Sequence, residues 1–239
     1  MTSRHRGLSR GRFALYVAAM HLDIVSDTIC PWCYIGKRRF ERALAAQPQP
    51  ELTVLWRPFQ LNPDMPPEGM ARKDYLAAKF GGSEGAEHAY TPVQEAGAGE
   101  SIPFDFEAMP RTPNTLLSHR LIRWAGEQGN QDALVETLFK AYFTKGRDIG
   151  DLDTLVELAV LAGADGDAAR RHLESEEGLR EVQAEDQLAR QSGINGVPAF
   201  ILNRKYLISG AQPPEAFLQA LTQVREEEEA GAEMPAAGA

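Results

Sequence analysis

Two cysteines separated by two residues are the feature of this sequence best suited to chemistry. Cys30 and Cys33 are the only cysteines among 239 residues, and they lie in the run SDTICPWCYIGKRRFERAL, residues 26–44. A disulfide between them would close so small a loop that it would add little stability. The spacing therefore favours a reversible redox pair over a structural crosslink.

A strand that runs directly into a helix would position the two sulfurs. Residues 21–26 alternate in part and carry Leu22, Ile24 and Val25, which suits a short strand, and Pro31 suits the first turn of a helix that extends to about Ala46. Because a helix N-terminus stabilises negative charge, the pattern predicts Cys30 as an exposed nucleophilic thiolate. Cys33 lies three residues later on the same helical face, within reach for a disulfide. We therefore expect Cys30 to attack and Cys33 to resolve the intermediate.

The same spacing also forms half of many zinc sites. The other half is hard to find in this chain, because it has no further cysteines and no two histidines with the spacing of a zinc-binding pair. The histidines are His5, His21, His88, His119 and His172. We therefore expect no metal.

Composition argues against several other classes of function. The formal net charge is −9 and the isoelectric point is near 5.1, whereas surfaces that bind nucleic acids or anionic membranes need clustered lysine and arginine. No apolar run approaches the roughly 18 residues of a transmembrane helix. With 43% hydrophobic and 25% charged residues, the sequence is typical of a soluble globular protein of one or two domains.

The remaining patterns give the order β-α-β, then a long helical block, then β-β-α. A strand is predicted over residues 52–56 and a hairpin over residues 199–202 and 206–209. Residues 62–113 read as irregular apart from one helix near 73–80. Further helices are predicted over residues 116–126, 133–145, 152–162, 167–173 and 178–191, and from Pro213 or Pro214 to about Val224.

Several runs, taken in order, resemble the FrnE-like subgroup of the DsbA-like branch of the thioredoxin superfamily. They are CPWCYIGKRRFE, RPFQLNP, the pair Asn114-Thr115, KAYFTKG, GVPAFI and SGAQP, and they span about residues 20–225. The resemblance implies an α/β, thioredoxin-like fold with a large all-helical insertion between the βαβ and ββα halves. The thioredoxin-like domain would be discontinuous, formed by residues 20–62 and 190–225, with the helical insertion at residues 63–189.

The two ends of the chain fall outside this resemblance. Residues 1–19 pair an Arg-rich start with a short apolar run, and we interpret them as a disordered leader or misassigned start. A secretory signal is the alternative. Residues 226–239 are predicted to form a disordered acidic tail. The protein is accordingly expected to be cytoplasmic, or exported if residues 1–19 act as a signal.

The resemblance implies a thiol–disulfide oxidoreductase or isomerase that acts on protein or small-molecule disulfides. Its partners would be proteins or small thiols, its redox group the Cys30–Cys33 pair without a bound cofactor, and glutathione a candidate co-substrate. One alternative is a glutathione-dependent isomerase or transferase resembling 2-hydroxychromene-2-carboxylate isomerase, whose relatives carry a serine where Cys30 stands. The other is a non-redox peptide-binding or chaperone-like module.

The resemblance also implies substrate-binding residues. Within the superfamily a loop with a cis proline faces the cysteines, and the run GINGVPAF looks like that loop. Pro198 would then follow a cis bond and Val197 would present its backbone to substrate, the alternative being a trans proline that opens a strand. Four polar residues would line the cleft, although the second suits a helix cap equally well: Asn62, Asn114, Thr115 and Gln212.

The sequence also suggests roles for other residues near the motif. Pro31 and Trp32 lie between the cysteines, where they would tune the redox poise and contact substrate, and Trp32 would form an apolar platform with Phe59. Asp27 would cap the helix, with proton transfer near Cys33 as the alternative role. The basic pair Lys37-Arg38 is expected to face solvent.

Overall fold

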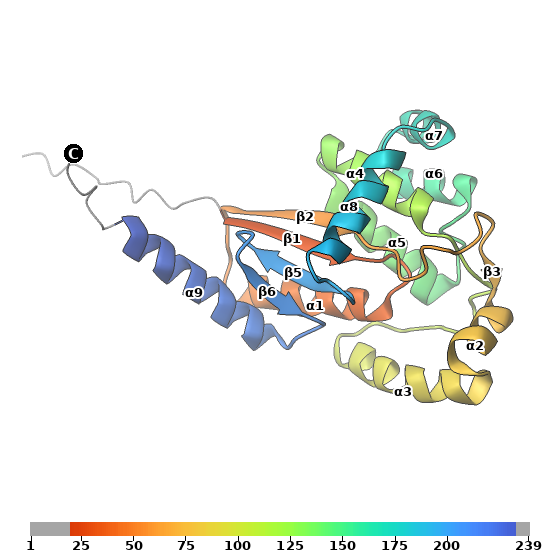
Figure 1. Ribbon diagram of the computed structural model, residues 1–239, viewed down its shortest axis with the longest axis horizontal. Coiled ribbons are helices and arrows are strands. Elements are labelled where there is room, and N and C mark those ends of the chain that lie inside the picture. Colours follow the sequence, from red (N-terminus) through yellow and green to blue (C-terminus); the bar gives the residue numbers. More distant parts are fainter. Residues whose placement is uncertain (1–19, 233–239) are drawn as a thin grey trace, which may run out of the picture.

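Four strands form a mixed sheet that runs through the middle of the protein (Figure 1). The computed structural model describes residues 20–232. The sheet has the order β2-β1-β5-β6, in which β1 and β2 are parallel and the other neighbours antiparallel. Its strands are β1 (Met20–Ser26), β2 (Leu52–Pro58), β5 (Ala199–Leu202) and β6 (Tyr206–Ser209). The predicted β-α-β and β-β-α halves therefore meet in one sheet, with β1 beside β5.

Helix α1 (Pro31–Ala46) connects the parallel strands β1 and β2 and packs beside α9 (Pro214–Ala232) (Figure 1). Three aromatic rings pack together between the sheet and these two helices. The ring centroid of Phe200 on β5 lies 5.9 Å from that of Phe40 on α1 and 4.7 Å from that of Phe217 on α9. Each such buried side chain contributes about 1.5–3 kcal/mol. The cluster anchors α1, and α1 carries the cysteine motif.

Between β2 and β5 the chain is mostly helical, and α4, α5 and α8 pack against β2. The helices are α2 (Arg72–Phe80), α3 (Ser83–Gly99), α4 (Leu116–Gln128), α5 (Gln131–Lys145), α6 (Leu152–Leu161), α7 (Gly166–Glu174) and α8 (Leu179–Gln191). A second sheet of two short strands, β3 (Met70–Ala71) and β4 (Arg111–Thr112), lies among them. The insertion was expected to be all-helical, and the small sheet of β3 and β4 shows that this detail is wrong. The bounds of the insertion as a separate domain, residues 63–189, stay a prediction.

Helix α3 lies within residues 62–113, where the sequence pattern predicted irregular structure. Many of its residues are alanine or glycine and Pro92 lies inside it, so the apolar pattern of a helix is faint. Gly97 has a packing role, because a Cβ atom at this position would come within 2.3 Å of the Phe104 ring. The run EAGAGE is thus mostly helical and not a loop, and its Gly97 allows close packing against Phe104.

The hairpin and the last helix complete the fold. Asn203 and Arg204 both have positive φ angles, 49° and 57°, as expected for the tight turns that match strand twist. Helix α9 continues to Ala232, so residues 226–232, which were expected to be disordered, are helical. The leader or signal proposed for residues 1–19 lies outside the described residues. Within residues 20–232 no helix has both the length and the apolar character needed to cross a membrane.

Candidate active site

The cysteine motif lies where β1 gives way to α1. Cys30 is the N-cap residue of α1, with extended backbone angles, and Pro31 occupies the first turn as predicted. The backbone N–H of Cys30 donates to the carbonyl of Asp27 at 3.0 Å, and that of Cys33 donates to the carbonyl of Cys30 at 3.0 Å. Both thiols are free. The chain therefore places two reduced thiols one helical turn apart.

Burial distinguishes the two thiols less than the sequence predicted. Cys30 is only 4% exposed, so the expectation of a freely exposed nucleophile is wrong, and Cys33 is fully buried. Burial raises the pKa of the Cys33 thiol well above its usual value, and the adjacent Cys30 raises it further. The Ser26 side chain and the Asp27 backbone hydrogen-bond to the sulfur and lower the same pKa. Cys33 is thus held as a neutral thiol with two groups ready to stabilise its thiolate.

The proline loop faces the motif. The Cys30 thiol donates to the carbonyl oxygen of Val197 at 3.5 Å, and the bond between Val197 and Pro198 is cis, as expected. A Cβ atom at Gly36 would come within 2.9 Å of the Pro198 ring, so only glycine lets α1 approach this loop. A glycine inside a helix costs about 0.5–1 kcal/mol relative to alanine. Because glycine is unfavourable inside a helix, its presence at position 36 of the predicted helix could have indicated a close contact. Gly36 was not singled out from the sequence.

A cleft of about 310 Å³ opens beside Cys30. Predicted residues Pro31, Trp32 and Val197 line it together with Cys30. Its other walls come from the β2–β3 connection, α2, α3 and β4 and include Leu61, Arg72, Tyr75, Lys79, Phe80, Tyr90 and Thr112. None of these wall residues was predicted as a site residue from the sequence. Tyr75, Lys79 and Phe80 fall in the helix predicted near residues 73–80, and Arg72, Tyr90 and Thr112 fall in the segment that reads as irregular.

An adjoining hollow of about 440 Å³ shares Leu61, Tyr75 and Lys79 with the cleft. Predicted residue Asn62 lines this hollow and donates to the hydroxyl of Tyr75 at 3.4 Å. Asn62 is therefore close to the cleft but does not line it.

Four other predicted residues lie outside the cleft. Asn114 accepts a hydrogen bond from the Leu116 backbone at 2.9 Å, which favours its role at the start of α4. Thr115 is buried beside Gln60, and Gln212 donates to a backbone carbonyl of the hairpin end. Phe59 is 2% exposed and packs in the core beneath the guanidinium of Arg190, so it forms no platform with Trp32.

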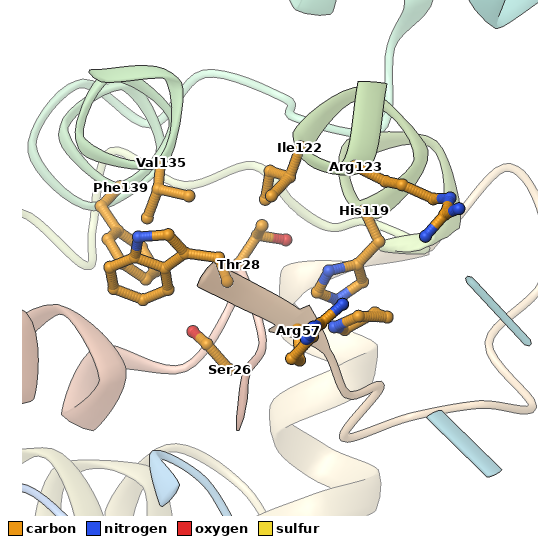
Figure 2. Close-up of a pocket in the computed structure, with 10 residues that line it drawn as sticks. Ser26, Thr28, Arg57, His119, Ile122, Arg123, Val135 and Phe139 are labelled. Carbon is orange, nitrogen blue, oxygen red and sulfur yellow. The ribbon is translucent and has the colours of Figure 1, made fainter. Parts of the chain in front are cut away.

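Asp27 does not cap α1. Its carboxylate accepts from the Leu61 backbone N–H at 2.7 Å and lies 3.3 Å from Nε2 of His119, and the helix start has no side-chain cap. Asp27 and His119 are both buried. His119, Ser26 and Thr28 line a neighbouring cavity of about 10 Å³ (Figure 2), roughly the volume that one water requires. Polar side chains thus meet apolar ones such as Ile122 and Phe139 in this small cavity. Neither His119 nor Ser26 was singled out as a site residue from the sequence.

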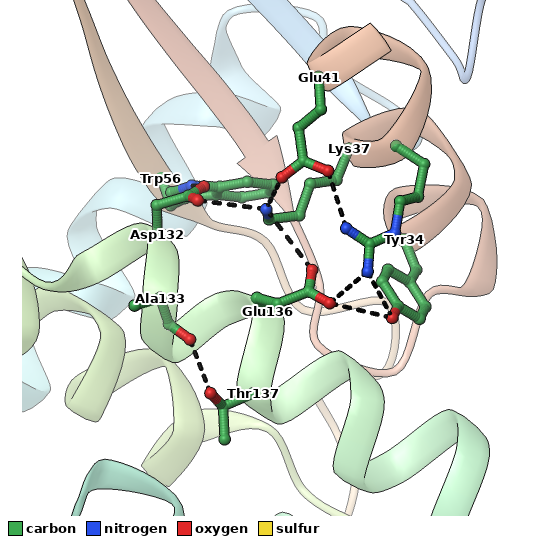
Figure 3. A network of polar contacts seen from close by, with 9 residues as sticks. Tyr34, Lys37, Glu41, Trp56, Asp132, Ala133, Glu136 and Thr137 are labelled. Carbon is green, nitrogen blue, oxygen red and sulfur yellow. Dashed lines mark hydrogen bonds and ion pairs between the residues drawn. The ribbon is translucent and has the colours of Figure 1, made fainter. Parts of the chain in front are cut away.

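The basic pair on α1 is not a solvent-facing pair. Lys37 is 2% exposed and joins α1 to α5, with Nζ 3.2 Å from Asp132 and 3.5 Å from Glu136, while Glu41 forms a third ion pair (Figure 3). Burial lowers the pKa of Lys37, but the three carboxylates outweigh burial and the pKa lies above its usual value. Arg38 is partly buried and also pairs with Glu136. This network fixes the helix that carries both cysteines.

Within the part of the chain that the structure describes, no group of three or more histidine, cysteine or acidic side chains could hold a metal ion.

The sequence and the fold are similar to those of known proteins. Residues 21–222 match the family described as "DSBA-like thioredoxin domain". The crystal structure of a probable DsbA oxidoreductase from Streptomyces coelicolor is 37% identical, with a TM-score of 0.78 over 92% of this chain and 93% of that chain. These matches confirm the α/β, thioredoxin-like fold and the DsbA-like resemblance expected from the sequence.

Two more distant structures share the fold. A 2-hydroxychromene-2-carboxylate isomerase is 17% identical, with a TM-score of 0.64 over 90% of this chain and 100% of that chain. The cytosolic disulfide reductase DsbM from Pseudomonas aeruginosa, solved with glutathione, is 19% identical, with a TM-score of 0.61 over 86% and 99%. At such identities the likeness shows the fold alone.

Proposed function

We propose, from the premise that this chain belongs to the family of DSBA-like thioredoxin domains, that it exchanges thiols and disulfides through the Cys30–Cys33 pair. Its substrates are proteins or small molecules with disulfides or thiols. One observation carries the proposal: Cys30 caps α1 and lines an open cleft, while Cys33 is fully buried one turn along the same helix. This arrangement suits one thiol to meeting substrate and the other to acting only afterwards.

The reductive direction has two steps. The Cys30 thiolate attacks one sulfur of the substrate disulfide, the substrate S–S bond breaks, and the first substrate thiol leaves. Cys33 then loses its proton and attacks Cys30 in the mixed disulfide, so that the second substrate thiol leaves and the Cys30–Cys33 disulfide forms. Two electrons pass to the substrate. Oxidation of a substrate dithiol is the reverse sequence.

The surroundings of Cys33 keep the two steps in order. Before attack, burial and the neighbouring Cys30 hold the pKa of Cys33 high, so Cys33 stays protonated. In the mixed disulfide Cys30 carries no charge, which removes one cause of that high pKa. The hydrogen bonds from Ser26 and Asp27 remain and stabilise the Cys33 thiolate as it forms.

The loop opposite Cys30 supports binding of an extended substrate. The carbonyl of Val197 accepts from the Cys30 thiol, so an incoming disulfide would meet the sulfur beside the backbone of Val197. We assign Val197, Pro198, Pro31 and Trp32 to substrate contact on the basis of this proximity.

Replacement of each cysteine tests the proposal. Cys30→Ser should abolish the reduction of insulin disulfides and the refolding of scrambled ribonuclease. Cys33→Ser should still attack but accumulate a mixed disulfide at Cys30, which intact-protein mass spectrometry detects. Undiminished insulin reduction by Cys30→Ser would overturn the proposal.

Glutathione is the small thiol that we propose as a co-substrate, because DsbM, a protein of the same fold, was solved with it. Reduction of oxidised glutathione by the dithiol protein, with a glutathione adduct on Cys30 in the Cys33→Ser variant, is the expected result. If Cys30→Ser instead keeps a glutathione-dependent isomerase activity, the isomerase alternative is correct. If the wild-type protein exchanges no disulfide, and the double variant Cys30→Ser/Cys33→Ser suppresses aggregation as the wild type does, the chaperone-like alternative is correct.

A further inference from the structure

The charge of the cleft is opposite to that of the protein. The chain carries a formal net charge of −9, yet among the described residues no aspartate or glutamate lines the cleft beside Cys30. The charged side chains that line it are two cations, Arg72 and Lys79, both on α2. In a protein with an excess of acidic residues, a cleft lined by two cations and no carboxylate differs from the rest of the molecule in its local charge.

Arg72 is held in place by neutral groups. Its guanidinium donates to the hydroxyls of Thr112 and Tyr90 and lies 5.6 Å from the ring centroid of Tyr75 and 5.4 Å from that of Tyr90. Its Nε is buried and has no hydrogen-bond partner within residues 20–232. These contacts orient the charge without neutralising it.

Lys79 has a similar environment about two turns further along α2. Its Nζ donates to the hydroxyl of Tyr75 at 2.6 Å and to the amide oxygen of Asn62 at 3.5 Å, and it lies 5.2 Å from the Tyr75 ring centroid. None of the ion pairs formed within residues 20–232 involves Arg72 or Lys79. By contrast, three arginines elsewhere on the insertion helices pair with acids: Arg123 with Glu185, Arg170 with Asp153, and Arg190 with Asp186.

We propose that this cleft selects low-molecular-weight disulfides and thiols that carry carboxylates near the reacting sulfur, and that Arg72 and Lys79 bind those carboxylates. The proposal rests on the thiol–disulfide exchange proposed above and names its substrate class. Charge-assisted hydrogen bonds to carboxylates are about twice as strong as neutral ones. A cleft of about 310 Å³ is also the size of a small-molecule site.

A matched series of three small disulfides tests the proposal. Dithiodipropionate, hydroxyethyl disulfide and cystamine share the same two-carbon arms and differ in being a dianion, neutral and a dication. Each disulfide is mixed with the pre-reduced protein, and the second-order rate is divided by the rate of the same disulfide with dithiothreitol, which removes differences in intrinsic reactivity. The reaction oxidises Cys30 and Cys33 to their disulfide and reduces the probe to two thiols, so no further reductant is required.

The wild-type protein should prefer the dianion to the dication by about tenfold or more at low salt, the lower end of typical electrostatic rate effects. The preference should fall towards one at about 1 M salt, where the Debye length is about 3 Å. It should also fall in Lys79→Gln and further in Arg72→Gln/Lys79→Gln. Lys73→Gln changes a lysine of the same helix outside the cleft, and it should keep the wild-type preference.

An unchanged preference in the Lys79→Gln and double variants, or no preference in the wild type, would overturn the proposal. Failure of the wild-type protein to react with any of the three disulfides would instead contradict thiol–disulfide exchange itself. Because Lys79 is exposed, the single Lys79→Gln variant keeps the test valid even if loss of Arg72 unfolds the protein.

Discussion

The imidazole of His119 lies 3.3 Å, Nε2 to Oδ1, from the carboxylate of Asp27, and both side chains are buried. Asp27 belongs to the turn before the cysteines, whereas His119 belongs to α4. The second oxygen of Asp27 accepts from the backbone of Leu61, a residue of the cleft wall. One buried carboxylate therefore joins the turn before the motif, the cleft wall and a helix of the insertion.

We expect this contact to stabilise the fold. His119→Leu leaves a buried carboxylate without one of its partners, which should lower the free energy of unfolding by about 1–3 kcal/mol. Urea unfolding of His119→Leu, Asp27→Asn and the double variant measures the coupling between the two residues. His88→Leu, an exposed histidine on α3, is the control and should change stability by less than about 0.5 kcal/mol. Strictly additive losses in the cycle would show that the contact has no energetic role.

The raised pKa of Cys33 makes the stability of the reduced protein depend on pH. Since the folded state keeps this thiol protonated at pH values where the unfolded chain releases the proton, the stabilisation is complete below about pH 8.5. It is lost as the pH rises above that value, with a slope of at most about 1.4 kcal/mol per pH unit. The free energy of unfolding of the dithiol protein between pH 8 and 10, minus that of Cys33→Ala, should fall as the pH rises. A flat difference would contradict the assignment of a high pKa to Cys33.

Loss of Lys37 should loosen α1 from the insertion. Lys37→Met removes the cation shared by Glu41, Asp132 and Glu136, so these acids repel one another. Because the acids are partly exposed, we expect a loss of about 1–3 kcal/mol, below the full cost of breaking a buried pair. Thermal and urea unfolding measure it, with Lys140→Met, an exposed lysine of α5, as the control. Equal stabilities of the two variants would show that the network of Figure 3 is dispensable.

A single methyl group at Gly36 should disturb the site. The new Cβ atom of Gly36→Ala would press on the Pro198 ring at 2.9 Å, and overpacking of this kind costs typically about 1–3 kcal/mol. The displaced loop should also slow disulfide exchange at Cys30. Gly99→Ala is the matched control, because nothing lies within 4 Å of its added Cβ atom. If Gly36→Ala is as stable and active as Gly99→Ala, the close approach of α1 and the proline loop has no importance.

The local order of the fold was accessible from the sequence. Alternation and helix-start residues are local signals, so they predicted β1, α1 and the hairpin of β5 and β6 closely. Helix α3 was missed because its small residues and Pro92 give little periodicity. The prediction that Cys30 and Cys33 form a redox pair needed no tertiary information, since their spacing depends only on one helical turn.

Only the tertiary structure decided how that pair is surrounded. Val197 meets Cys30 across 167 positions of sequence, and His119 meets Asp27 across 92 positions. Burial of Cys30 and Lys37 likewise depends on elements packed around α1, which no pattern within α1 reports. The cations of the cleft come from α2, whose placement beside the motif is set by packing of the insertion. Sequence spacing thus predicted which two thiols could react, and long-range packing decided how deeply they are buried and which charged groups line the cleft beside them.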